Sequence, residues 1–126
     1  MGDWVQVADL TELARRKRKL VMVGGEDIAL FLIDGQVYAL RDTCIHKQRS
    51  LSKGVVLRGR VICPGHQWAF DPATGQVDDQ EQCQPTYDVL VENDKVYVDP
   101  VRRLGGTRRV TGGEGQYELS PSPAPP

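Results

Sequence analysis

Two short segments, each with one cysteine and one histidine, constrain the fold of this chain more than any other feature. The segments are Cys44-Ile45-His46 and Cys63-Pro64-Gly65-His66. The chain contains only two histidines and three cysteines, so both histidines and two of the cysteines fall within these few positions. This clustering indicates that the four side chains bind one metal centre, and the fold must therefore bring the two segments face to face.

The mixture of thiolate and imidazole ligands suits either zinc or an iron–sulfur cluster. A structural zinc site with two Cys and two His usually keeps like residues together, as C-x2-4-C followed by H-x3-5-H, whereas each segment here has one of each. In a Rieske [2Fe-2S] centre, two cysteines hold one iron and two histidines hold the other. We therefore predict a Rieske cluster, with structural zinc as the alternative. The predicted ligands are Cys44, His46, Cys63 and His66.

The residues around these segments resemble those of the Rieske iron–sulfur proteins, and in particular those of the small soluble Rieske ferredoxins. The resemblance runs from about Trp4 to Asp99, which is most of the chain. Besides the two Cys/His segments, it is carried by Leu51-Ser52-Lys53-Gly54, Gln67-Trp68-Ala69-Phe70-Asp71, Thr74-Gly75, Val89-Leu90-Val91-Glu92 and Val96-Tyr97-Val98. It implies that the two cysteines bind one iron and the two histidines the other. Gln48 and Gln67 stand where the family usually has glycine, so we expect the loop backbones to differ there.

The resemblance also implies a low reduction potential. High-potential Rieske proteins of respiratory complexes link the two ligand loops by a disulfide, whose cysteines would fall at Arg49 and Gly65 here. They also place Ser and Tyr hydroxyl groups near the cluster, at positions that are Trp68 and Phe70 here. Hydrogen bonds to the cluster sulfurs raise the potential. Without these donors we expect the low end of the range of roughly −150 to +300 mV for Rieske centres, which argues against a subunit of a cytochrome bc complex.

The rest of the chain is predicted to form short strands separated by turns. Three hairpin patterns have strands at 28–33 and 36–40, 55–57 and 60–62, and 87–92 and 95–99. Their turns are Asp34-Gly35, Arg58-Gly59 and Asn93-Asp94, and Asp-Gly is especially typical of a tight hairpin. A further strand is expected at 20–23, and 10–19 is expected to hold the only helical turns. The pattern predicts an all-β antiparallel sandwich or barrel, capped at one end by a cluster-binding subdomain of two hairpin loops.

Length and charge exclude several classes of function. A chain of 126 residues fits one small domain, and a net charge of −1 gives no electrostatic basis for binding nucleic acid or a membrane surface. No stretch approaches the roughly 20 apolar residues of a membrane helix. With two of the three cysteines committed to metal, an odd thiol remains, which argues against a disulfide framework. We therefore expect a cytoplasmic protein in a reducing environment.

Three segments have a separate interpretation. Residues 1–99 are expected to form the Rieske domain, and residues 100–126 a Gly/Pro/Ser-rich tail that is largely disordered. The basic run Arg15-Arg16-Lys17-Arg18-Lys19 is interpreted as a solvated loop, with a docking patch for an acidic redox partner as the alternative. Cys83 is interpreted as a buried or half-buried structural residue, with a fifth ligand or a redox partner as the alternative.

A fully ligated cluster passes one electron at a time and has no open site for catalysis. An oxygenase would need a second, mononuclear iron held by two His and a carboxylate, and the chain has no histidine left for one. It also lacks the glycine-rich dinucleotide fingerprint. We therefore predict an electron carrier rather than an enzyme. The resemblance implies an NAD(P)H-dependent flavoprotein reductase upstream and a terminal ring-hydroxylating oxygenase downstream.

Two other functions remain open at this point. The first is the small electron-transfer subunit of an NAD(P)H-dependent nitrite reductase, since such subunits share the fold that the resemblance implies. The second, of another class, is a structural zinc or iron–sulfur sensor module without a role in electron transfer. Colour separates zinc from the cluster, because a zinc protein is colourless and a Rieske protein is red-brown.

Overall fold

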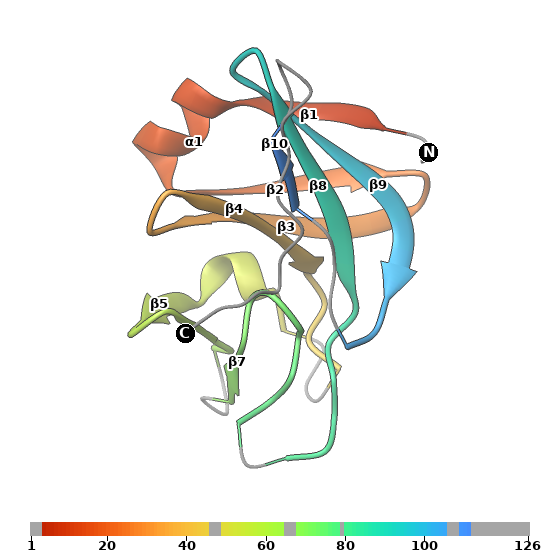
Figure 1. Ribbon diagram of the computed structural model, residues 1–126. Helices are drawn as coiled ribbons and strands as arrows, with labels where there is room; N and C mark the ends of the chain where they lie inside the picture. The colour runs from red at the N-terminus through yellow and green to blue at the C-terminus, as the bar shows by residue number, and fades with distance from the viewer. Residues whose placement is uncertain (1–3, 46–48, 65–67, 79, 106–108, 112–126) are drawn as a thin grey trace.

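The chain forms two sheets built mainly from antiparallel strand pairs (Figure 1). The computed structural model describes residues 4–45, 49–64, 68–78, 80–105 and 109–111. Its elements are β1 (Val5–Asp9), α1 (Leu10–Arg16), β2 (Arg18–Val23), β3 (Glu26–Ile33), β4 (Gln36–Arg41), the 3-10 helix η1 (Leu51–Lys53), β5 (Val55–Leu57), β6 (Arg60–Ile62), β7 (Ala69–Phe70), β8 (Thr86–Glu92), β9 (Lys95–Arg103) and β10 (Arg109–Thr111). The larger sheet follows the order β1-β9-β8-β4-β3-β2, with β10 paired in parallel to β8, and the smaller sheet follows β5-β6-β7. The predicted all-β fold with a subdomain at one end is confirmed.

All three predicted hairpins are present, and each turns through two residues. In the β3–β4 hairpin, Ile33 pairs with Gln36 around Asp34-Gly35, whose φ angles are 52° and 80°. The turns Arg58-Gly59 and Asn93-Asp94 also have positive φ at both residues. Positive φ at both central positions is the mark of the type I′ turn, whose twist matches that of the flanking strands.

The N-terminal region differs from the expectation in two respects. Strand β1, which pairs with β9, lies outside the predicted strands. The helix α1 is shorter than the predicted helical segment, because Lys17 adopts a left-handed conformation with φ 73° and its N–H donates to the carbonyl oxygen of Leu13 at 2.7 Å. A left-handed residue of this kind ends a helix, and β2 begins directly afterwards at Arg18.

Strand β9 also extends further than expected. We expect the folded domain to end at Asp99, but β9 continues to Arg103. The extension is attached by Arg102, whose Nε lies 2.5 Å from Glu26 Oε1. The hydrogen bond from Arg102, opposed by partial burial, holds the pKa of Glu26 below its usual value. The predicted tail therefore begins as part of the sheet, and its residues 112–126 lie outside the described ones.

Strand β3 is buried on both faces and separates two hydrophobic cores. On one face, its side chains join the core of the larger sheet, which contains Ala8, Leu13, Val23, Ile28, Leu30, Val37, Ala39, Tyr87, Val89, Val96 and Val98. On the other face, they join a second core, which contains Ala29, Phe31, Ile33, Leu40, Cys44, Leu51, Val61, Cys63, Phe70 and Val77. Successive side chains of a strand point to opposite faces, so a single strand supplies both cores. The second core, called here the cysteine core, lies between the two sheets.

Gly54, which follows η1, packs closely against the backbone of β6 in the smaller sheet. A Cβ on Gly54 would lie 2.0 Å from the carbonyl oxygen of Ile62. The φ of Gly54 is −82° and is open to any residue, so the cost of Gly54→Ala is steric. We expect this substitution to lower the free energy of unfolding by about 3 kcal/mol, as measured by chemical denaturation.

Gly35→Ala is the matched control for this substitution. Gly35 has φ +80° and no atom within 4 Å of its Cβ position, so only backbone strain opposes the change, by about 1 kcal/mol. A loss for Gly54→Ala that is no larger than the loss for Gly35→Ala would contradict the close contact with Ile62.

Candidate metal centre

Both cysteine loops are closed by the same backbone hydrogen bond. The N–H of Cys44 donates to the carbonyl oxygen of Arg49 at 2.8 Å, and the N–H of Cys63 donates to that of Trp68 at 2.9 Å. In each loop the acceptor is the fifth residue after the cysteine. The two loops therefore have the same span, and a cysteine begins each of them.

The pairings below the two loops also correspond. Thr43 forms a bridge with Ser50 at the base of the first loop, and Ile62 pairs with Ala69 at the base of the second. Each loop is thus the end of a short hairpin. The first loop follows β4 of the larger sheet and the second follows β6 of the smaller sheet, so the two sheets contribute one loop each.

The two loop cysteines lie in one buried group of side chains. Cys44 and Cys63 are both fully buried, and both belong to the cysteine core. All three cysteines of the chain are thiols outside any disulfide. Two soft sulfur donors at the start of two matched loops form half of the donor set of a Rieske cluster, so the described residues fit such a cluster.

The other two predicted ligands, His46 and His66, belong to these loops but lie outside the described residues. Gln48 and Gln67, where we expect the loop backbones to differ from the family pattern, lie outside them as well. Within the described ranges, no three of the His, Cys, Asp and Glu residues form a group that could hold a metal ion. Only two of the four predicted ligands fall in those ranges, so the full ligand set stays a prediction.

Cys83 lies apart from the two loop cysteines. It is half-buried, and its Sγ lies 3.3 Å from the carbonyl oxygen of Thr74. Its backbone forms a bridge with Gln76, in the segment that follows β7. This location supports the interpretation of Cys83 as a structural residue.

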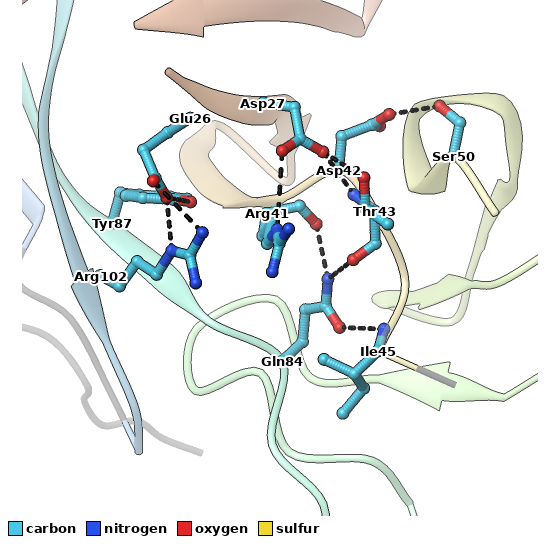
Figure 2. A network of polar contacts seen from close by, with 10 residues as sticks. All are labelled: Glu26, Asp27, Arg41, Asp42, Thr43, Ile45, Ser50, Gln84, Tyr87 and Arg102. Atoms are coloured by element: carbon cyan, nitrogen blue, oxygen red, sulfur yellow. Dashed lines mark hydrogen bonds and ion pairs between the residues drawn. The ribbon is translucent and has the colours of Figure 1, made fainter. Parts of the chain in front are cut away.

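Asp27, on β3, holds the chain immediately before the first loop (Figure 2). Its Oδ2 accepts hydrogen bonds from the backbone N–H of Thr43 at 2.8 Å and from Thr43 Oγ1 at 2.5 Å. Its Oδ1 lies 3.5 Å from Arg41 Nε. Burial acts to raise the pKa of Asp27, but the hydrogen bonds from Thr43 and the charge of Arg41 hold it below its usual value. Asp27 is therefore ionised at neutral pH and connects β3 to the first loop.

Asp42 holds the chain on the far side of the same loop. Its buried carboxylate accepts hydrogen bonds from Ser50 Oγ at 2.5 Å and from the backbone N–H of Ser52 at 2.7 Å. The N–H of Leu51 donates to the backbone carbonyl of Asp42 at 2.7 Å. These contacts fix the chain that leaves the loop against the chain that enters it.

Gln84, which precedes β8, is the third polar residue that supports this loop, after Asp27 and Asp42 (Figure 2). Its Nε2 donates to the carbonyl oxygens of Arg41 and Thr43, both at 2.7 Å, and its Oε1 accepts from the N–H of Ile45 at 3.0 Å. The three residues that support the loop, Asp27, Asp42 and Gln84, are not among the predicted site residues. They belong to no sequence motif, and the sequence alone does not indicate which backbone groups a single Asp or Gln will bind.

Aromatic side chains accompany the second loop. Phe70 is fully buried in the cysteine core, and Trp68 packs half-buried against that core. Their ring centroids are 6.5 Å apart, with the planes tilted by 54°. Neither side chain has a hydroxyl group that could donate a hydrogen bond to a cluster sulfur. The expectation of a low reduction potential depends on this absence.

Part of the basic run at 15–19 has a structural role that the sequence interpretation does not include. Arg18 Nη1 donates to the carbonyl oxygens of Ser52, at 3.0 Å, and of Gly54. Arg18 thus connects β2 of the larger sheet to η1 beside the first loop. Arg15, by contrast, is exposed, so the docking interpretation applies to the exposed part of the run, where it stays a prediction.

Comparison with known proteins agrees with this arrangement. The sequence profile of the Rieske [2Fe-2S] domain family matches residues 3–98. The ferredoxin component of the naphthalene 1,2-dioxygenase system of Pseudomonas putida is 30% identical over 102 residues, which cover 76% of this chain and 94% of that protein.

Two solved structures share the fold. The ferredoxin of carbazole 1,9a-dioxygenase from Nocardioides aromaticivorans IC177 has a TM-score of 0.71 at 27% identity, over 78% of this chain and 98% of that one. A chain in the complex of reduced oxygenase and oxidized ferredoxin in carbazole 1,9a-dioxygenase has a TM-score of 0.72 at 29% identity, over 80% of this chain and 96% of that one. None of the described helical segments has the length and apolar character that crossing a membrane requires.

Arg18→Met tests the connection between β2 and η1. The substitution keeps an unbranched apolar stem but removes the charged donor to two backbone carbonyls, and hydrogen bonds of this kind contribute about 1.5–3 kcal/mol. We expect a loss of that size in the free energy of unfolding, measured by chemical denaturation. Arg15→Met, in the same basic run but exposed, is the control and should change the free energy by less than about 0.5 kcal/mol. Equal effects of the two substitutions would show that Arg18 does not anchor η1.

Proposed function

The chain belongs to the Rieske [2Fe-2S] domain family, and we propose that it carries single electrons from a flavoprotein reductase to the oxygenase of a ring-hydroxylating system. As a member of this family it binds one Rieske-type [2Fe-2S] cluster. Like its ferredoxin relatives, it is an electron-transfer component and not a catalytic enzyme. The cluster of this family contradicts the zinc alternative, and the ferredoxin relatives favour electron transfer over the alternative of an iron–sulfur sensor module.

We assign the four ligands of the cluster to the two matched loops, with Cys44 and Cys63 on one iron and His46 and His66 on the other. The support for this assignment is the correspondence between the loops, since each begins with a buried cysteine and is closed by the same hydrogen bond. Corresponding loops offer corresponding donors to the two irons, as a centre with two Cys and two His needs. When bound, the cluster supplies reversible one-electron transfer.

Electrons are expected to enter and leave through the outer side of the loops. Phe70 and the two cysteines are fully buried, and Trp68 covers the same core, so packed side chains exclude water from the inner side. Ile45, which follows Cys44, is 39% exposed. A partner protein that contacts this side of the first loop therefore meets the accessible apolar side chain of Ile45.

The partners follow from the relatives and from the chemistry of the electron donor. A terminal oxygenase is the acceptor, since the matched carbazole 1,9a-dioxygenase ferredoxin forms a complex with its oxygenase. A flavoprotein is the expected donor, because nicotinamide cofactors deliver hydride and a flavin can divide it into single electrons. We place the protein in the cytoplasm, which is supported by Cys83, the cysteine outside the assigned ligand set, not forming a disulfide. No observation favours the alternative of a nitrite reductase subunit.

The purified protein should contain iron and acid-labile sulfide in equal amounts, and its reduced form should give the electron paramagnetic resonance (EPR) signal of mixed Cys/His ligation. It should be reduced by NAD(P)H only when the flavoprotein reductase of an oxygenase system is present, and be reoxidised by the terminal oxygenase. Stoichiometric zinc without labile sulfide after anaerobic preparation would refute the cluster. Reduction without reoxidation by any oxygenase would refute the proposed acceptor.

Substitution tests the ligand assignment separately. His46→Cys and His66→Cys should remove the Rieske spectrum, because the histidine-bound iron would gain a thiolate. Cys63→Ser should lose the cluster together with stability, since metal binding is coupled to folding. Cys83→Ser is the control and should keep the spectrum, because Cys83 lies outside the cysteine core. Bleaching of the Cys83→Ser protein would show that the assignment of four ligands is wrong.

Phe70→Tyr tests the origin of the low potential that we propose. Phe70 is buried in the same core as both cysteines, so the substitution adds a hydroxyl donor with little change in packing. A hydrogen bond to a cluster sulfur favours the reduced, more negative state, and we expect the midpoint potential in protein-film voltammetry to rise. A wild-type potential as high as that of respiratory Rieske proteins would contradict the low poise. A low wild-type potential that does not rise in Phe70→Tyr would leave the low potential standing but contradict its explanation by missing hydroxyl donors.

A further inference from the structure

The side chain of Gln84 makes three hydrogen bonds to the backbone on both sides of Cys44. Gln84 is fully buried. Both N–H groups of its amide are occupied, by the carbonyl oxygens of Arg41 and Thr43 at 2.7 Å each. Its amide oxygen accepts the N–H of Ile45 at 3.0 Å. Figure 2 shows the contacts of Gln84 with Arg41, Thr43 and Ile45. In the sequence, Cys44 lies between Thr43 and Ile45, so one side chain binds the backbone on both sides of the first cysteine.

The backbone of Gln84 is held by the segment that follows the second loop. Its N–H donates to the carbonyl oxygen of Gly75 at 2.7 Å. Gly75 in turn donates to the carbonyl oxygen of Asp71 at 2.7 Å, directly after β7. A Cβ on Gly75 would lie 1.9 Å from the carbonyl oxygen of Gln84, and Gly75 has φ +79°. Only glycine allows this approach, which presses the backbone of Gln84 against the turn behind the second loop.

We infer that Gln84 is a positioning residue that sets the first ligand loop relative to the second and keeps the N–H of Ile45 away from the cluster. The inference rests on the ligand assignment proposed above. Gln84 connects the two loops by hydrogen bonds alone. Its backbone binds Gly75, in the segment after the second loop, and its side chain binds the backbone at the first loop. In the sequence, Ile45 lies between the assigned ligands Cys44 and His46, so its N–H is the backbone donor that separates them. Gln84 accepts that N–H, which makes it unavailable to a cluster sulfur, and such a hydrogen bond would raise the reduction potential.

A purely structural role for Gln84 makes a different prediction. Removing a buried amide leaves its partners unpaired, which lowers stability wherever the amide lies. Positioning of the loop also changes the properties of the cluster itself. The reduction potential and the EPR g-values therefore distinguish the two roles, whereas stability alone does not.

The test compares Gln84→Met and Gln84→Asn with a control, Thr86→Val, each as the cluster-containing protein. Methionine has nearly the length of glutamine but no amide, and asparagine keeps the amide on a shorter side chain. Thr86 is also fully buried, but its Oγ1 lies 3.4 Å from the carbonyl oxygen of Arg103, in β9. The measurements are the midpoint potential by voltammetry, the EPR spectrum and the rate of cluster loss.

We expect an upward shift of the midpoint potential and altered g-values in both Gln84 variants, with severalfold faster loss of the cluster. Thr86→Val should lower stability and leave the potential and g-values unchanged. Failure of both Gln84 variants to hold a cluster, while an equally destabilised Thr86→Val holds it, would also support the positioning role. Gln84 variants with lower stability but with the potential and EPR spectrum of the wild type would overturn it.

The wild-type protein separates this inference from the ligand assignment. Wild-type protein without a Rieske EPR signal would overturn the assignment and, with it, the role of Gln84. A Rieske signal in the wild type together with unshifted Gln84 variants would overturn the role of Gln84 alone.

Discussion

The burial of β3 on both faces ties the two parts of the molecule together. Ile28 and Leu30 belong to the core of the larger sheet, and the alternate residues Ala29, Phe31 and Ile33 belong to the cysteine core. A slip of one residue in the pairing of β3 would exchange the two sets. The register of β3 therefore places the larger sheet and the two ligand loops with respect to each other. Asp27 on the same strand adds a polar contact to Thr43.

Much of this architecture can be predicted from local sequence. Asp34-Gly35 and the other two-residue turns carry their own backbone preference, and the alternating strands beside them supply the pairing. The two Cys/His segments identify the centre because few other ligands exist in the chain. The end of α1 could not be predicted in this way, since Lys17 takes a left-handed conformation that lysine does not favour. Strand β1 is short and depends on β9, which is distant in sequence.

The contacts that support the first loop could not be predicted because they join residues far apart in the chain. Gln84 lies in a polar stretch of sequence, yet it is fully buried. It binds the backbone around Cys44, which follows β4, the neighbour of β8 in the larger sheet. Asp27 likewise binds Thr43 from another strand. The partners in such contacts are decided by the tertiary structure, so they cannot be predicted from the identity of a single residue. The basic run shows the reverse case, since Arg18 looks like a surface charge but holds η1.

The smaller sheet depends on its surroundings for stability. All three residues of β5 are exposed, and the inward side chains of this sheet share their core with both loop cysteines. The larger sheet contributes β3 and β4 side chains to this core as well, but it has a further core on its other face that contains no cysteine. Amide hydrogen exchange of the two sheets should therefore be decoupled: the smaller sheet forms a cooperative unit that opens locally when the cysteines lose their metal, while the larger sheet stays closed until global unfolding. We therefore expect one folded domain to open in two stages, the smaller sheet before the larger one.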